Sequence, residues 1–443
     1  MTGDDVDEAN ETVEIRLTNP SNAVFAGNAS KLEGVGTITD DDLPTVSIKK
    51  LKKIAYDEGS DPDQTTDVVI SVILENKTDR EVTVGYKLGG DAKEGEDYEA
   101  PASKSVSIPA GSTSVDLVLK IKDDIRDEPN ESIGVTLENP ANARLGAASD
   151  INAVVRILDD DVAVLSVNSP TVVEGSGGKI GILPFKLTRT PSDFSTLFSL
   201  QPTKRGTAKL GNNFLTADVD TPEDPPDFFK AGETELFVNY RLIGDDIDEE
   251  NETFIVELKV TSRGMLPGGV DALEATGTIE DDDTRGVAVV PESLTVGEAD
   301  DAGTQDDREN EGSYTVVLDS EPTGDVVVNV ASGDTAVATV SKSSLTFTPG
   351  DWDEPQSVTV TAVNDDLDNA DDERTVTVSN TVDGGTSDYA AVTAPGVAVT
   401  VTDDDEPPVP TFSVADAKAS EGDSVTFTVT RSGAAGNAVG VTW

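Results

Sequence analysis

Residues 115–140, VDLVLKIKDDIRDEPNESIGVTLENP, carry the clearest indication of the fold expected for this chain. Apolar residues occupy every second position of 115–121 and again of 133–137, and the second run ends at Asn-Pro. Period-two alternation with many β-branched residues is typical of half-buried antiparallel strands. Residues 123–131 between the two runs are strongly acidic, so we expect an acidic loop joining two strands of a sheet.

Acidic motifs recur along the chain at a long, regular spacing. TITDDD, RILDDD, TIEDDD and TVTDDD place the first aspartate of each triplet at Asp40, Asp159, Asp281 and Asp403, in steps of 119, 122 and 122 residues. A step this long indicates tandem whole domains, because solenoid repeats are only about 20 to 50 residues long. The triplets therefore mark the ends of successive domains.

A second acidic motif lies inside each period. It reads DDVDEANET, DDIRDEPNES, DDIDEENET and DDLDNADDE, beginning at residues 4, 123, 245 and 365. Alternating strands flank it, as in TVEIRL (residues 12–17) and TFIVELKV (residues 253–260), and we find no helical pattern. Several short strands per domain predict an all-β chain of β-sandwiches. The Asn-Glu-Ser/Thr sequons at Asn10, Asn130 and Asn251 belong to this motif, and we interpret them as loop structure.

The repeats define domain boundaries. We expect three complete units at 43–161, 162–283 and 284–405. Residues 1–42 resemble the C-terminal part of a truncated unit, and residues 406–443 its N-terminal part, so we expect the chain to be a fragment of a longer array. Such partial sandwiches should expose strand edges.

Composition limits the partners and the location. The chain has 443 residues, of which 86 are acidic and 32 basic, giving a formal net charge of -54. This surface should repel nucleic acid and anionic membranes and attract cations or basic partners. No apolar run is long enough to span a membrane. The N-terminus lacks the basic start and apolar stretch of a signal peptide.

Histidine and cysteine are both absent. This excludes a Ser-His-Asp triad, a cysteine nucleophile, disulfides and ordinary zinc sites. A two-carboxylate glycosidase remains conceivable on composition. However, every acidic cluster recurs at the domain period, whereas an active site usually occurs once, so we expect no enzyme.

The acidic clusters call for a counterion. The motifs together cover 51 residues and contain 37 of the 86 acidic residues. A diffusely acidic, salt-adapted surface does not require such a concentration. A glutamate near the start of each unit can join them at one end of a sandwich. Two like charges at ~4 Å cost on the order of 1 kcal/mol in water and more near protein. Calcium accepts roughly 6–8 oxygen ligands with flexible geometry, so Ca²⁺ is the expected ion.

Residues 58–161 resemble the Calx-beta domain. The resemblance rests on Glu58-Gly59, EGEDY ending at Tyr98, Gly111, Asp123-Asp124, Asn130-Glu131, TLENP and the triplet at Asp159. Residues 174–283 match with EG, GTAKLGNNF, DDIDEENETF and DDD, except that Asn213 replaces the aspartate before the aromatic residue. Residues 284–405 are a more distant match, because the G.DY element is missing and ADDAGTQDDREN is inserted.

The resemblance implies an immunoglobulin-like sandwich of about seven strands with calcium bound in loops at one end. By position, it implies ligands in all three units. In the first unit they are Glu58, Asp97, Asp123, Asp124, Asp127, Glu128, Asp159, Asp160 and Asp161. In the second they are Glu174, Asp245, Asp246, Asp248, Glu249, Asp281, Asp282 and Asp283. In the third they are Glu298, Asp365, Asp366, Asp403, Asp404 and Asp405.

Two functions follow from this resemblance. The first is a calcium-stiffened structural stalk of a large bacterial surface or secreted protein, an adhesin that meets a cell-surface or matrix ligand. Calcium ions and neighbouring repeats of the chain are its partners, and its location is extracellular or the cell surface. The alternative is a regulatory calcium sensor in a membrane protein such as a cation exchanger.

Overall fold

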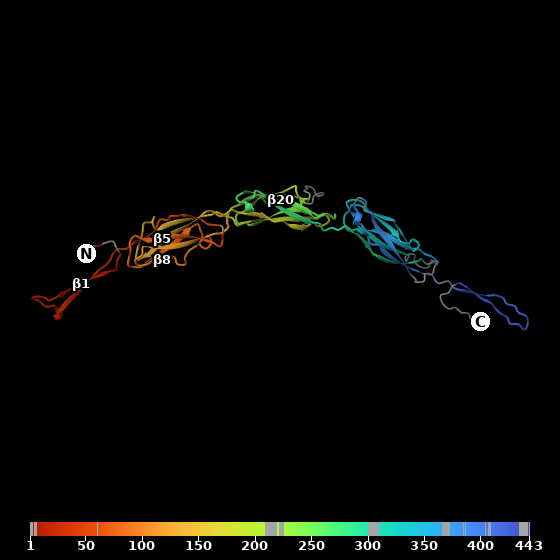
Figure 1. The fold of residues 1–443 in the computed structure, drawn as a ribbon, viewed down its shortest axis with the longest axis horizontal. Helices are drawn as coiled ribbons and strands as arrows, with labels where there is room; N and C mark the ends of the chain where they lie inside the picture. Colours follow the sequence, from red (N-terminus) through yellow and green to blue (C-terminus); the bar gives the residue numbers. More distant parts are fainter. Residues whose placement is uncertain are drawn as a thin grey trace.

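The computed structural model describes the chain except residues 1–2, 4–6, 60, 209–218, 221–225, 300–309, 366–372, 384, 386, 404, 406–408, 434–441 and 443. The described residues form β-strands and three short 3-10 turns, η1 (Ala26–Asn28), η2 (Pro267–Gly269) and η3 (Asp388–Ala391). Three antiparallel sandwiches follow one another along a gently bent rod, with a two-stranded hairpin at each end (Figure 1). The predicted class of tandem immunoglobulin-like β-sandwiches is confirmed. No helix in the described part is long and apolar enough to cross a membrane.

The first sandwich contains two five-stranded sheets, ordered β4-β12-β10-β6-β8 and β11-β3-β5-β9-β7. Neighbouring strands are antiparallel, except that β4 runs parallel to β12 and β11 parallel to β3. The strands are β3 (Thr45–Ile48), β4 (Ala55–Asp57), β5 (Thr65–Leu74), β6 (Val82–Gly90), β7 (Tyr98–Glu99), β8 (Ser105–Ile108), β9 (Ser114–Lys122), β10 (Glu131–Ala141), β11 (Arg144–Leu145) and β12 (Asn152–Leu158).

The other two sandwiches repeat this order, without a counterpart of β11 among their described residues. The second has sheets β13-β15-β19-β17 and β14-β21-β20-β16-β18, and the third has β22-β24-β28-β26 and β23-β30-β29-β25-β27. The second is built from β13 (Leu165–Val167), β14 (Thr171–Val173), β15 (Ile180–Arg189), β16 (Thr196–Pro202), β17 (Val219–Asp220), β18 (Phe228–Phe229), β19 (Glu235–Ile243), β20 (Glu252–Ser262) and β21 (Leu273–Glu280). The third is built from β22 (Val287–Val290), β23 (Ser293–Gly297), β24 (Glu311–Leu318), β25 (Val326–Ser332), β26 (Ala338–Val340), β27 (Ser344–Phe347), β28 (Gln356–Ala362), β29 (Glu373–Asp383) and β30 (Val397–Thr402).

The first strand of each sandwich is split between the two sheets. In the first unit, β3 pairs with β5, and the chain then crosses through residues 49–54 to let β4 pair with β12. The same switch takes residues 168–170 in the second unit and 291–292 in the third. The switch brings the residue after the short second strand next to the end of the last strand, at the tip that carries the acidic motifs.

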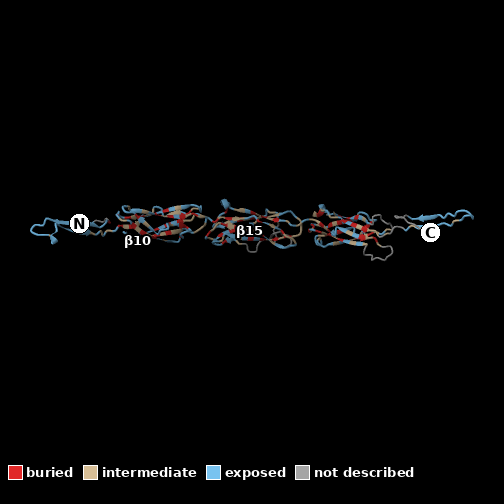
Figure 2. Cartoon of the chain, turned by 90° about the horizontal axis from the view of Figure 1, so that it is seen from below, coloured by how far each residue is buried: buried red, intermediate tan, exposed pale blue. Residues whose placement is uncertain are grey.

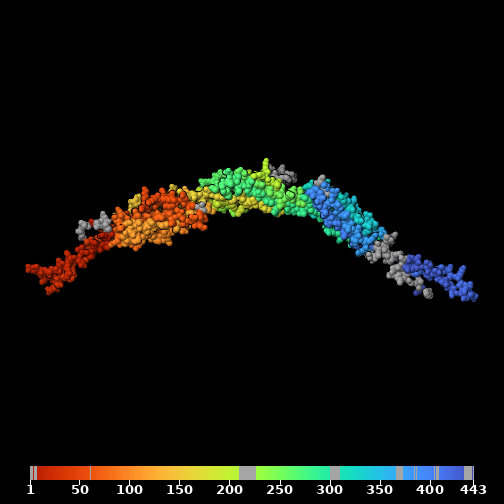
Figure 3. Space-filling model, in the orientation of Figure 1, coloured from red at the N-terminus to blue at the C-terminus, as the bar shows by residue number. Residues whose placement is uncertain are grey.

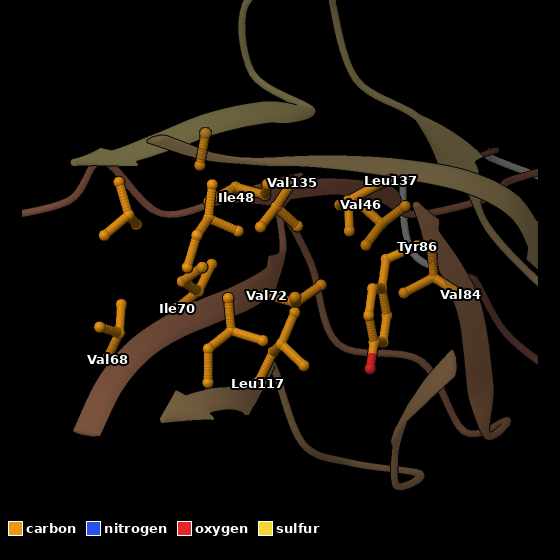
Figure 4. Close-up of a cluster of buried hydrophobic side chains, with 14 of the residues drawn as sticks. Val46, Ile48, Val68, Ile70, Val72, Val84, Tyr86, Leu117, Val135 and Leu137 are labelled. Atoms are coloured by element: carbon orange, nitrogen blue, oxygen red, sulfur yellow. The ribbon is translucent and has the colours of Figure 1, made fainter. Parts of the chain in front are cut away.

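Each sandwich has its own apolar core. In the first unit, Val68, Ile70 and Val72 of β5 face Val135 and Leu137 of β10, and all five are at most 1% exposed (Figure 4). The alternation seen in the sequence places these side chains between the sheets. Buried residues gather inside the three sandwiches, whereas the terminal hairpins are exposed (Figure 2).

The terminal hairpins are β1 (Glu11–Thr18) with β2 (Lys31–Ile38), and β31 (Thr411–Val414) with β32 (Val429–Ser432). The sequence predicts that Val13, Ile15 and Leu17 form the buried face of a strand. The strand forms, but these side chains are 54%, 63% and 53% exposed. The predicted burial of that face is wrong, because burial needs a second sheet, and among the described residues β1 pairs only with β2.

Candidate metal centres at the sandwich tips

One backbone hydrogen bond sets up the acidic tip of every unit. The N–H of Glu58 donates to the carbonyl of Leu158, the residue before the aspartate triplet, at 2.9 Å. The N–H of Glu174 makes the equivalent bond to Glu280 at 2.8 Å, and that of Glu298 to Thr402 at 2.9 Å. The three glutamates are 4%, 9% and 2% exposed. The parallel pairing of a short strand with the last strand therefore buries a carboxylate beside each triplet.

The asparagine of the acidic motif fastens that loop to the triplet. The Oδ1 of Asn130 accepts the N–H of Asp159 at 3.0 Å, and the Oδ1 of Asn251 accepts that of Asp281 at 3.2 Å. Asn10 does the same for Asp40 at 2.9 Å. In return, the N–H of Glu128 donates to Asp159 Oδ1 at 3.1 Å. The recurring sequons are thus structural clamps, as interpreted from the sequence.

A compact group of carboxylates lies between these loops in the first unit. Asp97, Glu128 and Glu131 each offer a carboxylate oxygen, and these oxygens lie within 4.8 Å of one another. Asp97 is 7% exposed, and its Oδ2 accepts the N–H of Lys93 at 2.5 Å. Arg126 is the cation beside the group, with its Nε 2.7 Å from a Glu128 oxygen.

Burial, followed by the charges of neighbouring carboxylates, raises the pKa values of three glutamates at this tip. Burial, followed by the charge of Asp124, raises the pKa of Glu58 to about 8. Burial and a hydrogen bond with Asp97 raise the pKa of Glu131 to about 8. Burial raises the pKa of Glu128 to about 7, although Arg126 opposes the shift. The folded protein therefore brings carboxyl groups together that cannot all be ionised at neutral pH without a cation.

A second group lies beside the first, around the triplet. Asp123 packs against Gly59, where a Cβ would lie 2.6 Å from a carboxylate oxygen, and the φ of Gly59 is +97°. Burial and the charges of Asp61 and Asp160 raise the pKa of Asp123. Burial, followed by the charge of Asp159, raises the pKa of Asp161 to about 6. Among the described residues, no donor reaches the buried Oδ1 of Asp123 or the buried Oδ2 of Asp161.

These observations fit a calcium ion. The donors are all oxygen atoms, they converge from several loops, and two of the buried ones lack a hydrogen-bond partner in the described structure. Calcium takes roughly 6–8 oxygen ligands and tolerates irregular geometry, whereas magnesium demands a near-octahedral set. A divalent cation would also allow the carboxyl groups with raised pKa values to ionise.

Two predicted ligands of the first unit have other contacts. The Oδ1 of Asp124 accepts the N–H of Arg126 at 2.6 Å, which shapes the loop. Asp127 reaches into the second unit, where its Oδ2 accepts the hydroxyl of Ser192 at 2.7 Å. Its N–H donates to Pro191 at 3.1 Å, and its carbonyl accepts from Asp193 at 2.9 Å. Asp127 is thus part of the joint between the first and second units.

The aspartates at the position of Asp127 in two other acidic motifs, Asp248 and Asp7, also lie at joints. The Oδ2 of Asp248 accepts the N–H of Arg285 at 3.0 Å, and the Arg285 Nε lies 3.0 Å from Asp388 of the third unit. Asp7 contacts the Thr78 hydroxyl and lies 3.5 Å from an Arg80 nitrogen. Figure 3 shows the units meeting end to end. The loops that carry Asp7, Asp127 and Asp248 therefore contact the unit that follows them in the chain.

The second unit repeats the frame. Asp245 donates its N–H to Glu174 Oε1 at 3.3 Å, and the N–H groups of Gly175 and Gly177 donate to Asp282 and Asp246, each at 2.9 Å. The N–H of Glu249 donates to Asp281 Oδ1 at 3.2 Å. Burial raises the pKa of Asp283 to about 6. The counterpart of the Asp97 loop, which includes Asn213, lies outside the described residues.

The third unit has a built-in cation at its tip. Arg374 contacts Glu298, and its Nη1 lies 3.1 Å from Asp365. Arg374 pairs in register with Val401, two residues before the triplet, just as Glu131 pairs with Ile157. An arginine thus replaces the cluster glutamate of the first unit. Glu298, Asp403 and Asp405 offer oxygens within 4.8 Å of one another, while Asp366 and Asp404 lie outside the described residues.

Sequence reasoning missed two acidic residues of the first unit. Glu131 belongs to the compact group, and Asp61 lies close enough to raise the pKa of Asp123. The signal for Glu131 was present, since it ends the acidic motif as the first residue of β10.

The fold and its acidic tips define a class of tandem immunoglobulin-like repeats with carboxylate clusters between units. Comparison with family models identifies it: residues 40–161, 159–283 and 304–406 match the Calx-beta domain. The matches cover more than half of the chain, which therefore belongs to the Calx-beta family.

Individual relatives are distant. Adhesion G-protein coupled receptor V1 of Danio rerio is 24% identical over 265 residues, which are 58% of this chain and 4% of the receptor. Among solved structures, CBD12 from CALX1.2 is 18% identical with a TM-score of 0.23, covering 49% of this chain and 80% of that one. The apo-form Calx CBD1 domain is 21% identical with a TM-score of 0.23, covering 27% and 100%. The human desmocollin-1 ectodomain is 11% identical with a TM-score of 0.28, covering 89% and 69%.

Proposed function

We propose that this chain is a calcium-binding structural array, a stalk of an extracellular adhesin-like protein whose joints stiffen when calcium binds. One observation carries the proposal: in the first unit, Asp127 contacts the next unit while the adjacent Glu128 belongs to the carboxylate group. An ion held by Glu128, Asp97 and Glu131 would fix the loop that also forms the joint.

Electrostatics gives the direction of the effect. Without an ion, the carboxylates repel one another or take up protons, and the loop loses its anchor on the tip. With an ion, ordering of the loop is stabilised by RT ln(1 + [L]/Kd), about 2.7 kcal/mol at 100 times Kd. Extracellular Ca²⁺ sites typically have Kd values of about 10⁻⁴–10⁻³ M, which suits a permanently extended stalk.

The tips of the three units differ in how much they need the ion. The first and second units present carboxylates with raised pKa values next to the joint. The third unit supplies Arg374 to its own acidic tip. We therefore assign calcium-dependent stiffness to the joints that follow the first and second units, and a weaker dependence to the tip of the third.

Small-angle scattering of the full chain with calcium and with a chelator tests the proposal. We expect a defined maximum dimension with calcium and a broader distribution of distances with chelator. Asp97→Asn combined with Glu131→Gln should behave like the chelated protein in either buffer. Glu94→Gln combined with Glu99→Gln, which removes two exposed charges of the same unit, is the matched control. Identical scattering with and without calcium would refute the stiffening, whatever the affinity.

A further inference from the structure

A run of lysines interrupts the acidic surface of the first unit. IKKLKKI (residues 48–54) places Lys49, Lys50, Lys52 and Lys53 within five residues, in a chain of net charge -54. The run forms the crossover between β3 and β4, on the flank of the sandwich, and all four lysines are exposed. We call residues 49–54 the lysine crossover.

The fold does not require these lysines. The second unit makes the same switch between sheets with Asn168, Ser169 and Pro170, and the third with Pro291 and Glu292. Both sandwiches keep the strand order of the first. The lysine crossover is longer than its two counterparts and is basic only in the first unit, so its charge has a reason other than folding.

The ammonium groups form no ion pair within the described structure. Other lysines of this unit pair with carboxylates: Lys87 with Glu138 at 2.6 Å, and Lys104 with Glu94 at 2.7 Å. Among the described residues, none of the four crossover lysines forms such a pair. The one contact they make through a side-chain nitrogen is that of Lys53, whose Nζ lies 4.4 Å from the centre of the Tyr56 ring.

Two shallow hollows flank the run. One, of about 310 Å³, lies between the lysines and Tyr56 and Val69. The residues that line the other, of about 350 Å³, include Lys49, Lys50, Ile54, Asp150 and Val154. Ile54 and Val154 are each 57% exposed. The surface thus combines dense positive charge with small apolar areas.

We propose that the lysine crossover is a docking surface for a sulfated polysaccharide. Short lysine-rich runs attract polyanions, and those of heparin type are a known class of ligand for them. Five residues span at most about 17 Å, so four positive charges need an equally dense row of anions. Several sulfates per disaccharide supply this density, and the sugar rings can cover Ile54 and Val154.

Other polyanions fit less well. A membrane or a nucleic-acid duplex is broad and would bring the surrounding carboxylates into contact with its own charge, whereas a narrow flexible chain can touch the crossover alone. A peptide cannot dock here by adding a strand to the sheet, because residues 49–54 are not in a strand. Screening at physiological ionic strength has a length of about 8 Å, so the remote acidic tips weaken the attraction only modestly.

Calorimetric titration of a heparin dodecasaccharide into the full chain, in chelator, tests the proposal independently of calcium. We expect binding that weakens with added salt. Neutralising all four lysines (K49Q/K50Q/K52Q/K53Q) should raise Kd at least tenfold. The control K77Q/K87Q/K104Q/K120Q removes the same charge from exposed lysines of the same unit and should change Kd less than twofold.

Three outcomes would overturn the proposal. The first is no binding of the dodecasaccharide at low salt. The second is equal loss of binding in the control variant, which would mean net charge alone is sensed. The third is tighter binding of poly-L-glutamate than of the dodecasaccharide, which would assign the surface to an acidic polypeptide. Thermal unfolding of both variants, unchanged within a few degrees, shows that any loss of binding does not come from loss of the fold.

Discussion

Calcium binding to the first unit should expel protons. The pKa values of Glu58 and Glu131 are about 8 and that of Glu128 is about 7. At pH 7, the two groups with pKa about 8 are each protonated in about nine tenths of the molecules, and Glu128 in about half. A calcium ion requires these carboxylates in their charged form.

The magnitude follows from those fractions. Filling the first unit at pH 7 should release about two protons, and filling it at pH 9 about a fifth of a proton. The same linkage should make the apparent affinity at pH 7 weaker than at pH 9, on the order of a hundredfold. The second unit contributes little at pH 7, because the pKa of Asp283 is about 6.

Titration calorimetry of the full chain in two buffers of equal pH but different ionisation enthalpy measures the protons directly. The observed heat should differ between the buffers in proportion to about two protons at pH 7. Glu58→Gln should lower the count by about one while leaving a binding event. A heat independent of the buffer would show that the group is already ionised without calcium, and the reasoning from burial and crowding would then be wrong.

Three further predictions follow from named contacts. In chelator, the free energy of unfolding of the first unit should fall as pH rises from about 4.5 to about 8. Carboxyl groups with raised pKa values bind more protons in the folded than in the unfolded state over this range, so rising pH favours unfolding. Melting temperatures at pH 5, 7 and 9 measure this, and a flat profile would contradict it. Arg374→Glu should make the stability of the third unit depend on calcium: it should lose about 2 kcal/mol in chelator and regain it with calcium, whereas Arg374→Lys should not. Differential scanning calorimetry with and without calcium measures this, and a variant that calcium does not restabilise would count against an ion site there. Ser192→Ala should weaken the joint between the first and second units by about 1 kcal/mol and broaden the scattering distances even with calcium. Unaltered scattering would show that the Asp127 contact does not hold the joint.

The alternation of apolar residues was sufficient to predict strands and sandwiches. Val135 and Leu137 are buried as the period-two pattern requires, because side chains of a strand point alternately to its two faces. The repeat spacing of the triplets likewise predicted tandem sandwiches. The exposure of Val13 and Ile15 could not be predicted in the same way, because alternation defines one face of a strand but cannot supply the second sheet that would cover it.

The acidic motifs recur at the strand ends of every unit, and this pattern is sufficient to predict that carboxylates gather where one repeat ends. It does not predict which of them meet, because that depends on how the strands pair in the folded protein. Asp127 and Glu128 are neighbours in the chain, yet one contacts the next unit and the other joins Asp97. Arg374 takes the place of Glu131 only through strand register, although Glu373 is its match in the motif. Position along a chain gives the order of charged groups, but hydrogen bonding between distant strands sets which of them come within a few ångströms.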